Sequence, residues 1–112
     1  MTSATPKTIT SITLTAGDWD VRANFGFNPA GTTSVTLLVG SISLTTNTLD
    51  TTNGRFTQIS QAANVPANNF AFGGNPVRFS LSATTTIFLV EDAVFTVSTM
   101  NGFGIIAARR MR

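Results

Sequence analysis

The chain has 112 residues, which is enough for one domain with a buried core. Only 11% of the residues are charged and the net charge is +2, so much of the surface is expected to be covered by copies of the chain or by a partner. The sequence contains no Cys, His or Tyr. Disulfides and thiolate chemistry are therefore excluded, and the commonest general base and metal ligand are absent.

Residues 1–10 combine Pro6 with small polar side chains and are predicted to form an extended N-terminal arm. The rest of the chain, 11–112, is predicted to be a single β-sandwich domain. No apolar run approaches the roughly 20 residues that span a bilayer, and the start of the chain lacks the apolar region of a signal peptide. We therefore expect no membrane partner.

The first half of the chain predicts three strands. β-branched residues indicate a strand over 9–15, and 34–44 is a long β-rich run whose apolar alternation changes phase near Gly40, which predicts a bulge or bend there. Between them lies the clearest pattern, in which polar residues alternate with a set that should form one buried face: Trp19, Val21, Ala23, Phe25 and Phe27. A turn is predicted over 28–31.

The second half predicts further strands separated by polar loops. A polar loop over 45–54 ends in the turn signal Asn53-Gly54, and a short strand follows over 56–60. Strands are also predicted over 77–81, over 86–90 with an extension or a further strand at 94–98, and over 103–111. With no helical periodicity, these elements predict an all-β protein with a jelly-roll β-sandwich.

The loop predicted over 62–75 contains Asn69, Phe70 and Phe72. Aromatic side chains on loops often anchor binding partners, so these residues could form an exposed tip. The alternative is that the loop folds back and buries its Phe side chains on the core.

The acidic residues do not form a recognisable catalytic pattern. Asp18 and Asp20 lie roughly 7 Å apart on one face of a strand, which fits a solvated polar face. Glu91 and Asp92 interrupt an apolar strand and are interpreted as its exit, with a salt bridge across a subunit interface as the alternative. A calcium site needs six to eight oxygens, and no loop dense in Asp, Asn and Gly supplies them. We predict no catalytic, cofactor-binding or metal site, and a protein that is not an enzyme.

Three arginines lie near the C-terminus, at positions 109, 110 and 112. They could bind phosphate, pair with partner carboxylates, or stay solvated. Arg109 and Arg110 point to opposite faces of a strand, which argues against one shared phosphate pocket. An interface or solvent is therefore favoured, and no nucleic-acid partner is expected.

Two stretches together resemble a small domain that is common in virion proteins of tailed bacteriophages, often at the C-terminus of tail fibres. They are residues 14–21, LTAGDWDV, and residues 81–112, which include LSATTTIFLV and FTVST. The most specific part is the ending, Phe103-Gly104 followed by ARRMR at 108–112. The chain departs from the pattern at Ala107, where another arginine is expected, and at Phe88 and Phe103, where tyrosines are frequent. The order of features is also similar to the trimeric jelly rolls of the C1q and tumour-necrosis-factor type.

This resemblance implies a structural protein on the exterior of the virion. The expected function is that of a capsid decoration, or cement, protein that docks as a homotrimer on the major capsid protein or another virion protein and stabilises the shell. A chain in which the domain follows only a short arm supports this expectation over a long fibre. The expected capsid-docking residues are in the arm: Thr5, Pro6, Lys7 and Thr8. The expected subunit interface is formed by Phe88, Val90, Phe103, Ile105 and Arg109.

The alternative is a tail-fibre or fibre-tip domain that binds a host surface receptor or glycan. Its contacts would come from the predicted tip, Asn69, Phe70 and Phe72. A third class, a glycan-degrading enzyme, would require Asp18→Asn or Asp20→Asn to abolish an activity, and none is expected.

Overall fold

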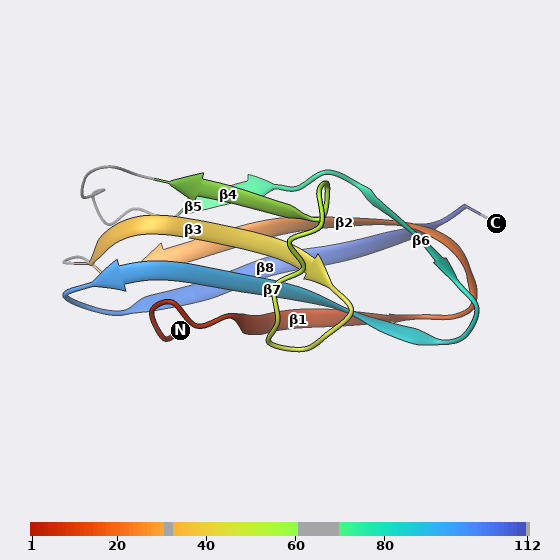
Figure 1. The fold of residues 1–112 in the computed structure, drawn as a ribbon, viewed down its shortest axis with the longest axis horizontal. Coiled ribbons are helices and arrows are strands. Elements are labelled where there is room, and N and C mark those ends of the chain that lie inside the picture. Colours follow the sequence, from red (N-terminus) through yellow and green to blue (C-terminus); the bar gives the residue numbers. More distant parts are fainter. Residues whose placement is uncertain (31–32, 61–69, 112) are drawn as a thin grey trace.

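The computed structural model describes residues 1–30, 33–60 and 70–111. Within these ranges eight strands form two antiparallel sheets that pack face to face, and the molecule measures 46 × 19 × 19 Å (Figure 1). The predicted all-β sandwich is confirmed. The same ranges contain no helix long and apolar enough to cross a membrane.

The first sheet has the strand order β1-β7-β3-β4. Its members are β1 (Lys7–Leu14), β7 (Thr85–Thr96), β3 (Ser34–Ser43) and β4 (Phe56–Ser60). The strand predicted over 86–90 continues through 94–96 as one element, so the predicted strand exit at Glu91 and Asp92 is wrong. Both residues lie in the middle of β7, where Glu91 pairs with β1 and β3 and Asp92 pairs with β3.

The second sheet is built around one long strand, β2, which is paired along both edges. One edge pairs with β8 over its whole length, and the other pairs with β6 near the start of β2 and with β5 near its end. The bounds are β2 (Gly17–Pro29), β8 (Met100–Arg110), β6 (Val77–Leu81) and β5 (Phe70–Gly73).

The predicted apolar face of β2 forms the centre of the core. Val21, Ala23, Phe25 and Phe27 are buried between the sheets, which confirms the alternation. Trp19, at the start of the strand, is only half-buried. Its ring lies under the Arg110 guanidinium at 5.3 Å, and its indole N–H donates to the carbonyl of Thr15.

The bulge predicted near Gly40 is wrong. The register of β3 against β7 shifts between Val35 and Leu37, whereas Gly40 stays in register with both neighbouring strands. Gly40 is needed for another reason, because a Cβ atom there would overlap the ring of Phe25. The apolar alternation changes phase in the sequence because Ser41 and its neighbours on the outer face of β3 are buried as well as the residues of the inner face.

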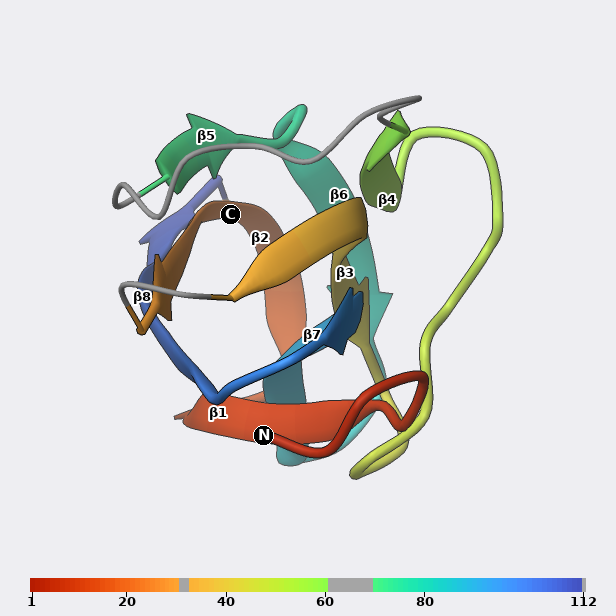
Figure 2. The ribbon, with the colours of Figure 1, turned by 90° about the vertical axis from the view of Figure 1, so that its left-hand side faces the viewer.

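The segment between β3 and β4 covers that outer face. It crosses the first sheet as a long excursion outside the strands (Figure 2). Asn47 Oδ1 accepts a 2.8 Å hydrogen bond from the Thr8 N–H of β1, and Ser41 Oγ of β3 donates to the Asp50 carbonyl. Val90 lies on β7 between Thr8 and Ser41, and it is completely buried.

The predicted loop over 62–75 is wrong for its last part, because residues 70–73 form β5. This short strand pairs with 24–27 of β2. Phe72 stacks on Phe27 with ring centroids 5.8 Å apart and lies 5.7 Å from the Phe25 ring. The local sequence is rich in Gly and Asn and does not predict this strand, because the strand is stabilised by aromatic contacts with a neighbouring strand.

Candidate functional site

An apolar strip lies on the outer face of β8. The strand alternates as predicted, with Gly102 and Gly104 directed inward and Phe103 and Ile105 directed outward, 43% and 69% exposed. Glycine is required on the inner side because a Cβ atom at Gly104 would come within 2.6 Å of a carbonyl oxygen of β2. The strip is therefore the solvent side of a strand that packs very closely on the core.

The neighbouring strands extend this strip into a shallow groove. The Phe103 ring lies over Gly26 of β2, where a Cβ atom would overlap it. A groove of about 60 Å³ is lined by Gly26 and its surroundings, including Asn24, Ala71 and Ile105. Monomeric proteins seldom leave adjoining large apolar side chains exposed without a partner.

Charged residues occupy the other end of the same face. Asp20 of β2 lies in register between Arg78 of β6 and Arg109 of β8. Arg22 lies one step further along β2, opposite Ala107, and a hollow of about 200 Å³ opens between these residues and Arg109. The outer face of the second sheet thus runs from an apolar end to an end where arginines predominate.

The predicted C-terminal arginines have different environments. Arg109 is exposed on the outer face, whereas Arg110 donates to Thr15 Oγ1 and the Ala16 carbonyl, both at 3.2 Å, and covers Trp19. Position 112 lies outside the described residues. The two described arginines therefore do not form one anion pocket, as the alternation predicted.

Glu91 is the most unusual titratable group in the described structure. Its side chain points inward from β7 and is completely buried. Oε2 accepts a 3.0 Å hydrogen bond from the Gly26 N–H, and Oε1 has no hydrogen-bond partner among the described residues. A Cβ atom at Gly102 would lie 2.5 Å from Oε1, so this glycine makes room for the carboxyl group. Burial raises the pKa of Glu91 to about 8.

The inward direction of Glu91 was not predicted from the sequence, although one signal is present in it. Residues 87, 89, 91, 93 and 95 share one parity on β7, and the other four are the apolar residues Ile87, Leu89, Ala93 and Phe95. If the strand is taken to continue past position 91, this alternation places the carboxyl group of Glu91 in the core. The interpretation of a strand exit prevented that inference.

The other carboxyl groups are separated from Glu91 and from one another, and Asp92 Oδ1 is also buried without a hydrogen-bond partner among the described residues. Burial raises the pKa of Asp92, on the outer side of β7. A hydrogen bond from the Thr52 side chain lowers the pKa of Asp50, and Arg55, whose guanidinium lies 2.9 Å away, adds to this effect. Within the described ranges, no three Asp or Glu residues come together in a group that could hold a metal ion.

The residues expected at the subunit interface lie on two different faces. Phe103, Ile105 and Arg109 share the outer face of the second sheet. Phe88 is half-buried on the outer side of β7 in the first sheet, and Val90 is completely covered within one chain. The structure brings together the three residues of β8 and separates them from the two of β7.

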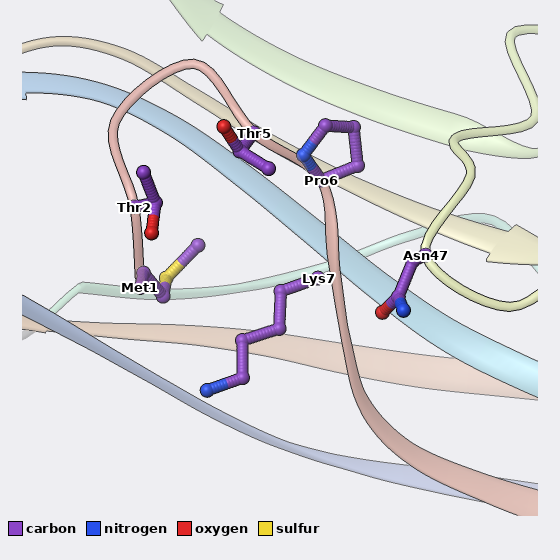
Figure 3. Close-up of a pocket in the computed structure, with 6 residues that line it drawn as sticks. All are labelled: Met1, Thr2, Thr5, Pro6, Lys7 and Asn47. Atoms are coloured by element: carbon purple, nitrogen blue, oxygen red, sulfur yellow. The ribbon is translucent and has the colours of Figure 1, made fainter.

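The expected docking residues lie at the start of the chain. Thr5 and Pro6 precede β1, whereas Lys7 and Thr8 belong to it. A surface hollow of about 560 Å³ is lined there by Met1, Thr2, Thr5, Pro6, Lys7 and Asn47 (Figure 3). Thr5 and Lys7 are exposed there, while the Thr8 hydroxyl contacts Thr46.

The expected tip residues are only partly described. Asn69 lies outside the described residues, and of Phe70 only the backbone, in β5, can be placed. Phe72 is half-buried on Phe25 and Phe27, which favours the alternative in which this segment folds back onto the core.

Comparisons with known proteins do not add a family. No family model, curated protein or solved structure matches the chain.

Proposed function

We propose that the chain is a structural protein of a bacteriophage particle, a jelly-roll capsid decoration protein that binds the exterior of the shell as a homotrimer. The observation that carries the proposal is the outer face of β8, where Phe103 and Ile105 are exposed at one end and Arg109 at the other. Phe103 and Arg109 also belong to the C-terminal motif on which the resemblance to phage virion domains depends. The proposal assigns the protein no catalytic activity.

The β8 face suits an interface between copies on energetic grounds. Fully burying a large apolar side chain contributes about 1.5–3 kcal/mol. Phe103 and Ile105 are exposed in the single chain, so much of this free energy would be gained only when a second copy covers them. Asp20 and Arg109 are cross-strand neighbours on this face, so it carries charges of both signs. Copies arranged around a threefold axis could bury the strip and pair these charges.

The start of the chain is the proposed contact with the shell. Thr5 and Lys7 are exposed at the surface hollow, and Pro6 and Thr8 lie beside them. A protein that binds the assembled shell and not its free subunits stabilises the shell by mass action. This arrangement uses the outer face of β8 for trimer formation and the start of the chain, which begins beside the first residue of β8, for docking to the capsid protein.

The test compares two single substitutions that each place a charge on an exposed apolar residue. Ile105→Glu should convert the trimer to monomers, whereas Leu44→Glu, at a residue that is 46% exposed beside β3, should leave it intact. Light scattering after size exclusion measures the mass, and circular dichroism checks that each variant is folded. A wild-type chain that is monomeric at micromolar concentration would contradict the trimer.

Shell binding is measured separately, by co-sedimentation of the purified protein with particles that lack it. Binding that raises the temperature of shell disruption supports the decoration function. Binding to host cells without binding to shells would contradict it and would support the fibre-tip alternative.

A further inference from the structure

The edge of β7 beyond Glu91 is not covered by β1. Lys7 pairs with Glu91 at the start of β1, so β7 continues for five more residues, 92–96, with β3 on one side. A sheet edge without a neighbouring strand offers N–H and C=O groups to any extended segment. Residues 1–4 of the chain occupy this position.

The first residues hold this edge with few hydrogen bonds. The Ala4 N–H donates to the Ala93 carbonyl at 2.8 Å, and the Phe95 N–H donates to Ser3 Oγ at 3.0 Å. In the second bond a side-chain hydroxyl takes the place of a strand carbonyl, so residues 1–4 do not continue the ladder of β1. The segment is a cap on the edge and not part of the sheet.

Met1 provides the anchor of this cap. Its backbone nitrogen donates to the Met100 carbonyl at 2.9 Å. Its sulfur lies beside Gly102. A Cβ atom added to Gly102 would be 3.1 Å from Met1 Sδ, 2.7 Å from an Ile9 methyl and 2.5 Å from Glu91 Oε1, so these three side chains meet at this glycine. The Met1 side chain thus closes the core near the buried carboxyl group.

The connection between the cap and β1 is strained and lies over open space. Ala4 has φ +58°, a left-handed conformation that an L residue with a Cβ atom disfavours. A turn closes between the Thr5 N–H and the Thr2 carbonyl, at 3.2 Å, above the 560 Å³ hollow. Pro6 favours an extended Thr5, so the reversal of the chain is confined to Ser3 and Ala4, and the strain is at Ala4.

We propose that residues 1–4 are exchanged between copies of the chain, so that the β7 edge at Ala93–Phe95 and the Met1 anchor site of one chain receive this segment from a second chain. The contacts of residues 1–4 with β7 and with Met100 are the same when a second chain supplies them. Only the 3.2 Å hydrogen bond that closes the turn is lost, and the left-handed conformation of Ala4 is relieved. The inference rests on the proposed oligomer. The two connecting residues extend at most about 7 Å, so the second chain must already lie beside this edge.

The test uses the absence of cysteine from the chain. Ser3→Cys with Val94→Cys places one thiol at the position of Ser3 Oγ, which accepts from the Phe95 N–H, and the other on the preceding residue of β7. The thiol is a weaker acceptor than the hydroxyl, and this affects intrachain and interchain contacts alike. The protein is mixed from isotope-labelled and unlabelled chains, refolded at micromolar concentration and oxidised. Mass spectrometry of the linked peptides then separates bonds within one chain from bonds between chains. We expect most of the bonds to join two chains.

The control pair is Thr13→Cys with Thr86→Cys, whose hydroxyls lie 3.1 Å apart across β1 and β7. This pair belongs to a continuous ladder and should link only within one chain. A Ser3–Val94 pair that also links only within one chain, in protein that light scattering shows to be oligomeric, overturns the exchange and leaves the proposed oligomer standing. If the protein is monomeric and every link is internal, both proposals are overturned.

A variant without cysteines gives an independent readout. Ala4→Gly removes the Cβ atom that makes the turn unfavourable, so the turn should persist within each chain. We expect the oligomer to dissociate at a concentration at least about threefold higher than the wild type. An unchanged dissociation concentration overturns the strain argument on which the exchange depends.

Discussion

Replacing Glu91 by Gln tests the buried carboxyl group at the centre of the sandwich. Gln has nearly the same shape and its amide oxygen can still accept the hydrogen bond from the Gly26 N–H, but it cannot ionise. The wild-type carboxyl group is completely buried with one oxygen unpaired among the described residues. The substitution therefore removes the cost of burying a charge while it preserves the packing.

The pKa of Glu91 gives the sign and the size of the expected effect. Burial raises it from an ordinary 4.5 to about 8. Between these pH values the native state binds more protons than the unfolded state, so the free energy of unfolding falls as the pH rises. The contribution is fully present below pH 4.5 and is lost by the time the pH has passed through the folded value. At 1.36 kcal/mol for each pKa unit, the loss approaches roughly 5 kcal/mol, which is a large part of the total stability of a small domain.

The assay is urea unfolding from pH 4 to pH 9, followed by the fluorescence of Trp19, the single tryptophan of the chain. Wild type should lose stability steadily between pH 5 and pH 8, whereas Glu91→Gln should change little over that range. Asp50→Asn is the control, because a hydrogen bond from Thr52 and the nearby Arg55 lower the pKa of Asp50, so this group does not titrate above its ordinary range. The variant should therefore retain the wild-type slope between pH 5 and pH 8. Parallel slopes for wild type and Glu91→Gln would refute the assignment.

Three further substitutions test the packing by thermal or urea unfolding. Gly40→Ala should destabilise the protein by about 1–3 kcal/mol, because the new Cβ atom overlaps the Phe25 ring. Gly73→Ala is the control and should cost much less, because the nearest atom to its new Cβ is a backbone oxygen 4.0 Å away. Equal losses for the two variants would contradict the overlap at Gly40. Val97→Asn should stabilise by about 1 kcal/mol, since Val97 has φ +81° and is 80% exposed; a destabilised variant would show that this turn is not strained. Phe27→Ala should cost about 3–5 kcal/mol because Phe27 is fully buried, and a loss below 1 kcal/mol would mean that the core has been misplaced.

Much of the second sheet, and strand β4 of the first sheet, could be predicted from local pattern. The alternation from Trp19 to Phe27 indicated the buried face of β2, and the structure confirms it for four of those five residues. The strand predicted over 56–60 has the bounds of β4. The outward direction of Phe103 and Ile105 on β8 follows from the glycines that alternate with them. In each case the pattern repeats every two residues within one strand, so a local reading is sufficient.

Two of the errors occur where a distant segment changes the environment of a strand. Ser41 and Val90 face outward, yet both are buried because the segment after β3 returns across the sheet. Phe72 belongs to a strand because β2 supplies its partner and two aromatic rings. Nothing within the neighbouring residues of either position specifies such a contact.

The sequence by itself determined the all-β class, the two-residue period of the strands and the side of most strands that is apolar. Only the tertiary structure decided which strands pair, which outer face is covered and which remains open, and that the carboxyl group of Glu91 lies within the core. The physical reason is that side-chain direction is set by the geometry of one strand. Strand pairing and burial depend on contacts between segments far apart in the chain, whose closure no local pattern encodes.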